Sequence, residues 1–169
     1  MRMIGIAVVV LSLASSVLAG ERTVTVMADK TPALVLTAPA AAEVTPWKGK
    51  TVIHTTNMFL NVWLVPEAKT LNDVQARLDD VIKGDVLKFV ASATNQLTVA
   101  GSPALHLSGK CVEADDGDAA TADIVIFSVG NHIFVAYVHG EDNAASRERD
   151  PMLKMLQTAK SPQAQPAAK

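Results

Sequence analysis

Four carboxylates within six residues form the densest group of chemistry-bearing side chains in this sequence. They are Glu113, Asp115, Asp116 and Asp118. Hard cations such as Ca²⁺ take oxygen ligands of this kind. The spacing differs from the helix-loop-helix calcium motif, which needs acidic positions at 1, 3 and 5, glycine at 6 and glutamate at 12. An Asp-Gly pair is also typical of a tight turn, so the loop 113–118 is either a solvated turn or a divalent-cation site, with Ca²⁺ as the cofactor.

A second candidate site is the pair His139 and Glu141, which follows an apolar segment. Histidine titrates near neutral pH, so a His–Glu pair at a strand end could transfer protons in a small hydrolase or isomerase. Acidic residues at this place also cap a following helix and complement its dipole. The sequence contains no GxSxG, HExxH, Walker or CxxC motif, which favours a protein that is not an enzyme.

Cys111 is the single cysteine of the chain, so no internal disulfide can form. It shares strand parity with Leu105 and Leu107, which predicts a buried thiol. His106 has the opposite parity and should point to the other face, which argues against a metal site made of His106 and Cys111.

The first nineteen residues have the pattern of a cleavable export signal. Arg2 precedes an apolar run, 3–14, that is too short to span a membrane, and small residues end the segment at Ala19. Glu21 stands near the expected cleavage point where a lipoprotein would need a cysteine. We therefore expect a signal peptide over 1–19 and a soluble mature protein, periplasmic or secreted, with no later membrane span.

The composition predicts one globular domain. The chain has 169 residues, of which 49% are hydrophobic and 19% charged, and this balance is typical of a packed protein rather than a disordered one. We expect a single domain over 20–160 and a disordered tail over 161–169, which is rich in Pro, Ala and Gln. The net charge is −2 and no basic stripe occurs, so nucleic acid is not an expected partner.

The apolar periodicity predicts strands followed by helices in an α+β order. Expected strands cover 23–27, 33–36, 51–65 in two parts, 86–91, 97–100, 103–112, 124–129 and 133–138, and expected helices begin at Thr70 and Asp150. The two strands 124–129 and 133–138 are apolar on both faces, so they should lie in mid-sheet with a cover on each side. We expect a mainly antiparallel sheet with two helices packed on one face. The other face would be covered by the N-terminal strands or by a second subunit.

This order of elements resembles the Mog1/PsbP-like α+β sandwich group of small exported domains. The segment 99–104, Val-Ala-Gly-Ser-Pro-Ala, is similar to the Gly-x-Pro-Ala entry to a strand in exported members of that group. The likeness covers 51–160 and implies a non-enzymatic binding or accessory domain. The resemblance assigns no functional residue to this chain.

These observations together predict an exported accessory or binding domain. Its expected partner is a protein or a small apolar ligand, held by an uncovered apolar patch or groove. Trp47 and Trp63 are expected as core anchors, although such aromatics can also line a ligand cleft.

Overall fold

The computed structural model describes residues 20–28, 31–140 and 145–162. The predicted signal peptide, Glu141 and residues 163–169 lie outside these ranges. The strands are β1 (Glu21–Ala28), β2 (Thr31–Pro39), β3 (Glu43–Trp47), β4 (Lys50–His54), β5 (Met58–Leu64), β6 (Val86–Val99), β7 (Ser102–Glu113), β8 (Ala119–Val129) and β9 (His132–Gly140). The helices are α1 (Leu71–Ala76), α2 (Leu78–Ile82) and α3 (Ala145–Gln157).

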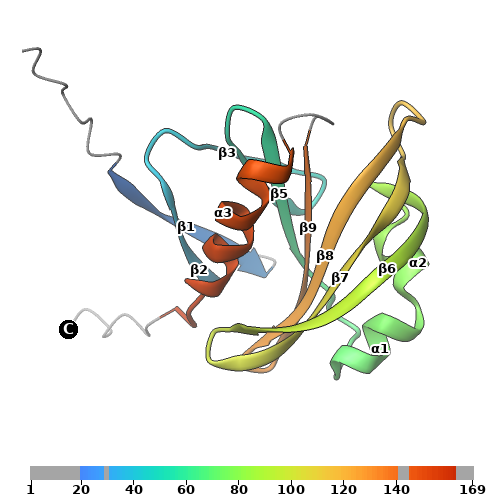
Figure 1. Ribbon diagram of the computed structural model, residues 1–169. Coiled ribbons are helices and arrows are strands. Elements are labelled where there is room, and N and C mark those ends of the chain that lie inside the picture. The colour runs from blue at the N-terminus through green and yellow to red at the C-terminus, as the bar shows by residue number, and fades with distance from the viewer. Residues whose placement is uncertain (1–19, 29–30, 141–144, 163–169) are drawn as a thin grey trace, which may run out of the picture.

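The described strands form two antiparallel sheets (Figure 1). The larger has seven strands in the order β3-β4-β5-β9-β8-β7-β6, and β1 and β2 pair as a separate two-stranded sheet. The predicted hairpin of β8 and β9 therefore lies in mid-sheet, as expected. It turns at Gly130, whose φ of 58° lies in the left-handed region that glycine tolerates.

Side chains of the central strands alternate between two separate cores. Ile124 and Ile126 of β8 are fully buried in one core, whereas Val125 and Phe127 are fully buried in the other. The strands that the sequence predicted to be apolar on both faces therefore bury side chains on both faces of the sheet. Each face of the sheet therefore needs its own cover.

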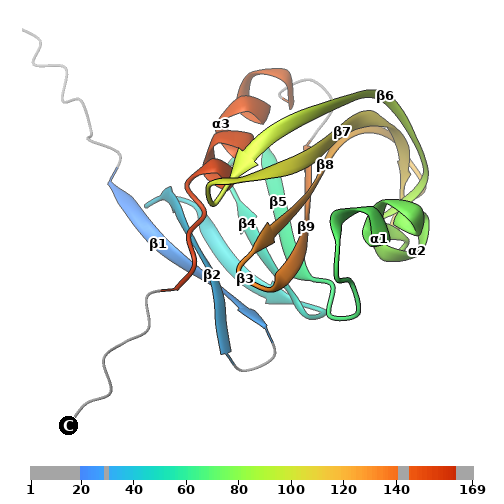
Figure 2. The same ribbon diagram turned by 90° about the horizontal axis from the view of Figure 1, so that it is seen from below.

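The two covers contradict the expectation that two helices pack on one face. The segment α1–α2 packs on the face of Ile124 and Ile126 through Val74 and Ile82, while α3 and the hairpin β1–β2 pack on the opposite face. Figure 2 shows α1 and α2 far from α3, across the curved sheet. The physical reason is that a sheet apolar on both sides leaves no face that could stay open to water.

The helix predicted to begin at Thr70 starts there as expected and then breaks. Thr70 accepts a hydrogen bond from the Asp73 amide, and the Asp73 carboxylate accepts one from the Thr70 amide, which is a capping box. Arg77 interrupts the helix because its amide donates to the carbonyl of Val74, three residues back, in place of the residue four back. The segment thus forms two short helices, each burying one apolar side chain deeply.

Three other segments differ from expectation. The helix predicted to begin at Asp150 is α3, which begins at Ala145 and contains Asp150 and Pro151 in its interior. The strands predicted at 86–91 and 97–100 are one strand, β6, which accommodates two register shifts against β7. Residues 43–47, where no strand was predicted, form β3, which pairs with β4 across a turn at Lys48 and Gly49, both with positive φ. This hairpin places Trp47 at the rim of a cleft on the sheet.

Candidate functional site

A cleft of about 780 Å³ opens on the sheet face that bears Tyr137. Its floor contains Phe59 and Asn61 of β5 and His139 at the end of β9. Trp47 of β3 lines it from one side, and the loop between β7 and β8 lines it as well. A volume of this size accommodates a small organic ligand.

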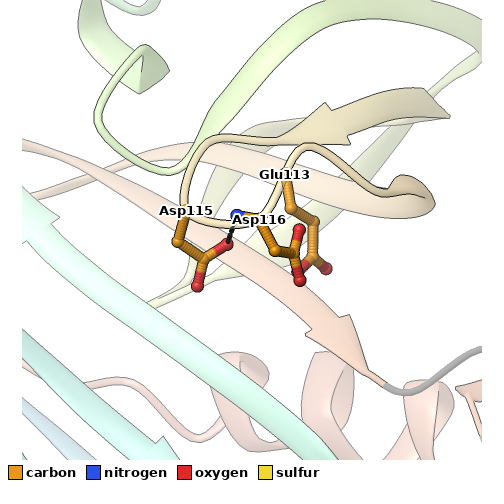
Figure 3. A group of neighbouring side chains, drawn as sticks. All are labelled: Glu113, Asp115 and Asp116. Carbon is orange, nitrogen blue, oxygen red and sulfur yellow. Dashed lines mark hydrogen bonds between the residues drawn. The ribbon is translucent and has the colours of Figure 1, made fainter.

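The β7–β8 loop brings three of the four predicted carboxylates together. Glu113, Asp115 and Asp116 each offer an oxygen within 4.8 Å of the others (Figure 3). Asp118 lines the same cleft but is not a member of this group. The loop is shaped by its own side chains, because Asp115 accepts a hydrogen bond from the Asp116 amide at 3.0 Å and Asp116 accepts one from the Asp118 amide at 2.9 Å.

His139 lies within a column of four stacked rings. Its imidazole is 4.3 Å from the Tyr137 ring and 5.0 Å from Phe59, which in turn stacks on His54 at 4.2 Å. Its Nδ1 lies 3.5 Å from a carboxylate oxygen of Glu113. Burial lowers the pKa of His139 to about 4, despite the nearby negative charge of Asp85 and Asp115. His139 is therefore neutral at pH 7. Its predicted partner Glu141 lies outside the described residues.

A buried ion pair lies beside Asn61, on the same sheet face as the cleft. Lys50 pairs with Asp85, and the two side chains are 12% and 3% exposed. The Lys50 ammonium also lies 4.3 Å from the centre of the Trp63 ring, and the Asn61 side-chain amide donates to Asp85 at 3.3 Å. Among the described residues the other polar atom of Asn61, Oδ1, is buried without a hydrogen-bond partner. An unsatisfied acceptor of this kind favours a donor from water or a ligand.

The charge of the cleft is negative on balance. The loop contributes four carboxylates, and Asp85 is already neutralised by Lys50. Another nearby cation, Lys48, lies 4.2 Å above the ring of Trp47, which is 41% exposed. An aromatic ring beside several carboxylates is a suitable environment for a cation.

The sequence indicated the acidic loop but not Phe59 or Asn61, which face it only through the sheet register.

A second polar cluster is buried on the opposite sheet face, between the sheet and α3. Asp123 accepts from Ser108 at 2.5 Å and lies 2.8 Å from His106 Nε2, and Arg149 Nε lies 2.8 Å from its other oxygen. Burial alone would raise the pKa of Asp123, but the hydrogen bonds from His106 and Ser108 and the charge of Arg149 lower it. Sequence reasoning missed this cluster, because its members meet only across the paired strands.

The cluster does not have the geometry of a Ser-His-Asp catalytic triad. Ser108 and Asp123 both approach Nε2 of His106, whereas a triad needs the carboxylate on the other ring nitrogen. The arrangement instead ties α3 to the sheet through Arg149. Cys111 is buried in the opposite core, as its parity predicted, and burial raises the pKa of its thiol, which makes it a poor nucleophile.

Comparison with known proteins identifies the fold. No family model matches the sequence, and no curated protein is similar enough to count as a relative. The structure is similar to cyanobacterial PsbP (CyanoP) from Synechocystis sp. PCC 6803, with a TM-score of 0.59 and 12% identity over 89% of this chain and 98% of that one. The fold is PsbP-like. The resemblance predicted from the sequence is thus confirmed at the level of the fold.

A second similar structure is LpqN of Mycobacterium tuberculosis, described as involved in cell envelope biogenesis. Its TM-score is 0.50, with 14% identity over 85% of this chain and 91% of that one. At these identities the likeness concerns architecture and not residues. In the part of the chain that the structure describes, no helix has the length and apolar character needed to cross a membrane.

Proposed function

We propose that this protein is an exported accessory domain that binds a positively charged ligand in the acidic cleft and does not catalyse a reaction. The observation that carries the proposal is the meeting of Glu113, Asp115 and Asp116 beside the rings of Phe59 and His139. Carboxylates supply charge, and flat rings supply contact area and cation–π attraction. The predicted export signal supports a periplasmic or secreted location, and so does the similar fold of LpqN, a protein involved in cell envelope biogenesis.

The ligand class follows from the charge of the cleft and from its buried acceptor. The loop carboxylates favour a cation, and the buried Oδ1 of Asn61 favours a hydrogen-bond donor. An ammonium or guanidinium group supplies both in one ligand. The charge of the cleft therefore leads us to propose a cationic ligand rather than the apolar ligand that the sequence suggested.

A non-enzymatic role agrees with the state of His139. A general base works best when its pKa lies near the operating pH. With a pKa of about 4, the His139 imidazole is a weak base at neutral pH. Its ring is also held between Phe59 and Tyr137, which suits a rigid wall of a binding site.

A second candidate function is divalent-cation binding by the same carboxylates. Ca²⁺ binds oxygen at about 2.3–2.6 Å, so two ligands on opposite sides of one ion are separated by roughly 4.6–5.2 Å. The oxygens of Glu113, Asp115 and Asp116 lie within 4.8 Å of one another and could reach a single ion. Water or backbone carbonyls would complete its coordination.

Isothermal titration calorimetry with two probes tests both candidates. The probes are L-arginine amide, a small guanidinium with no carboxylate, and CaCl₂. The double variant Asp115→Asn, Asp116→Asn should weaken binding of either probe by about tenfold or more, because it removes two charges. The matched control is Asp79→Asn, Asp80→Asn, which removes two exposed charges from α2 and should leave binding unchanged.

The two probes separate the candidates. Binding of arginine amide in the presence of a chelator supports the organic cation, and binding of Ca²⁺ alone supports the metal site. If neither probe binds at millimolar concentration, or if both double variants behave alike, the proposed use of the cleft is wrong.

A further inference from the structure

Strand β6 forms one outer edge of the seven-stranded sheet. It stands last in the strand order, and Figure 2 shows it along the outer rim. Within the described residues its ladder partner is β7, on one side. Residues 91–96 are all exposed, so both faces of the strand are open to solvent there. A long edge of this kind presents backbone amide and carbonyl groups that can pair with another strand.

The opposite edge of the sheet is protected in the usual ways. Strand β3 has five residues and includes Glu43 and Pro46, and proline has no amide hydrogen to donate. Strand β6 has fourteen residues. Its first half carries two register shifts, between Leu87 and Val90 and between Ala91 and Ala93, and such bulges disrupt pairing.

The second half of β6 has none of these protections. Residues 93–99 pair with β7 in seven consecutive regular positions. Their sequence, Ala-Thr-Asn-Gln-Leu-Thr-Val, contains no charge and no proline. This half is therefore regular and uncharged. Its residues 93–96 and Thr98 are exposed, whereas Val99 at its end is buried in the core.

We propose that residues 94–98 of β6 pair antiparallel with the same residues of a second copy, across a two-fold axis near Gln96. Two-fold pairing brings a segment against itself, so any charge near its centre would meet a like charge. The absence of charge over 93–99 makes a second copy an acceptable partner. Gln96 would face Gln96 of the second copy, and their side-chain amides can hydrogen-bond to each other.

The pairing leaves the cleft accessible in both copies. Residue Val99 pairs with Ser102 at one end of the β6–β7 ladder, whereas Val86 pairs with Glu113 at the other end. The acidic loop follows Glu113, so the cleft and the proposed contact lie at opposite ends of this hairpin. Because strand pairing alone buries less surface than a standard interface, we expect a weak dimer that depends on concentration.

Sedimentation velocity over a range of concentrations tests the proposal. The full chain is expressed and purified. It should pass from monomer to dimer as the concentration rises from about 1 to 500 µM. Gln96→Lys places two lysines against each other and should raise the dimer dissociation constant about tenfold or more. Thr25→Lys is the control, because it adds the same charge at an exposed position of β1, and it should leave the constant unchanged.

Hydrogen exchange locates the contact independently. Amides over 94–98 should exchange more slowly at high than at low concentration in the parent protein, and not in Gln96→Lys. A protein that stays monomeric throughout would overturn the proposal. So would a dimer that Gln96→Lys and Thr25→Lys affect equally, because the contact would then lie elsewhere. Circular dichroism melting of both variants checks that they remain folded.

Discussion

Lowering the pH should destabilise this protein through His139, and the structure gives the size of the effect. Unfolded, the imidazole takes up a proton near its ordinary pKa of 6.5, whereas in the folded protein burial lowers the pKa to about 4. Between these values the unfolded state binds more protons, so stability rises with pH. Above pH 6.5 the His139 imidazole is neutral in both states and does not lower the free energy of unfolding. As the pH falls from 6.5 toward 4, the free energy of unfolding decreases.

The magnitude follows from the two pKa values. Each pH unit across the window costs about 1.4 kcal/mol. Near pH 4.5 the loss from this one group is therefore about 2.5 kcal/mol. The side chain is 18% exposed, so solvent screening reduces this figure only in part. A loss of that size is a large share of the stability of a typical domain.

Urea unfolding followed by tryptophan fluorescence measures the effect. The free energy of unfolding is determined near pH 7.5 and near pH 4.5 for the parent protein and for His139→Gln, which cannot titrate. The parent should lose about 2.5 kcal/mol more than the variant. The control His132→Gln replaces an exposed histidine and should follow the parent. If the parent and His139→Gln lose the same free energy, burial does not hold His139 neutral and the reasoning fails.

Three further changes test the fold by the same urea unfolding at pH 7. Thr70→Ala removes the capping box with Asp73 and should cost about 1 kcal/mol; an unchanged midpoint would show that the cap contributes nothing. Asp123→Asn removes the negative charge that pairs with Arg149 and accepts two hydrogen bonds, and it should lower the free energy of unfolding by about 3 kcal/mol. An unchanged free energy of unfolding would contradict the role of this cluster in holding α3. Phe127→Ala, at a fully buried site, should cost about 4 kcal/mol; a loss below about 1 kcal/mol would place Phe127 outside the core.

Local signals in the sequence predicted the local elements well. Thr70 and Asp73 stand three residues apart, which is enough to specify a helix start. The two apolar strands around Gly130 likewise specify a hairpin. What the pattern cannot specify is the face on which a helix packs, because an apolar stripe requires burial and does not say against which surface. The opposite placement of α1–α2 and α3 is therefore decided by tertiary packing.

The candidate site was predictable only where its residues are neighbours in sequence. The carboxylates of 113–118 belong to one loop, so composition alone identified them. Phe59 lies beside His139 because β5 and β9 pair in one particular register, and about eighty residues separate them in the chain. The same reason explains why His106 and Asp123 were not seen as partners. Long-range strand register is a property of the whole sheet and not of any segment.

The most direct test of the central claim, cation binding in the acidic cleft, is an NMR titration of ¹⁵N-labelled protein with L-arginine amide. We expect saturable shifts of the Trp47 indole N–H and of the backbone amides of 113–118 and His139, with the β1–β2 amides unmoved. In Asp115→Asn, Asp116→Asn these shifts should need about tenfold more probe. Shifts spread over the whole surface, or an identical titration of that variant, would contradict the account.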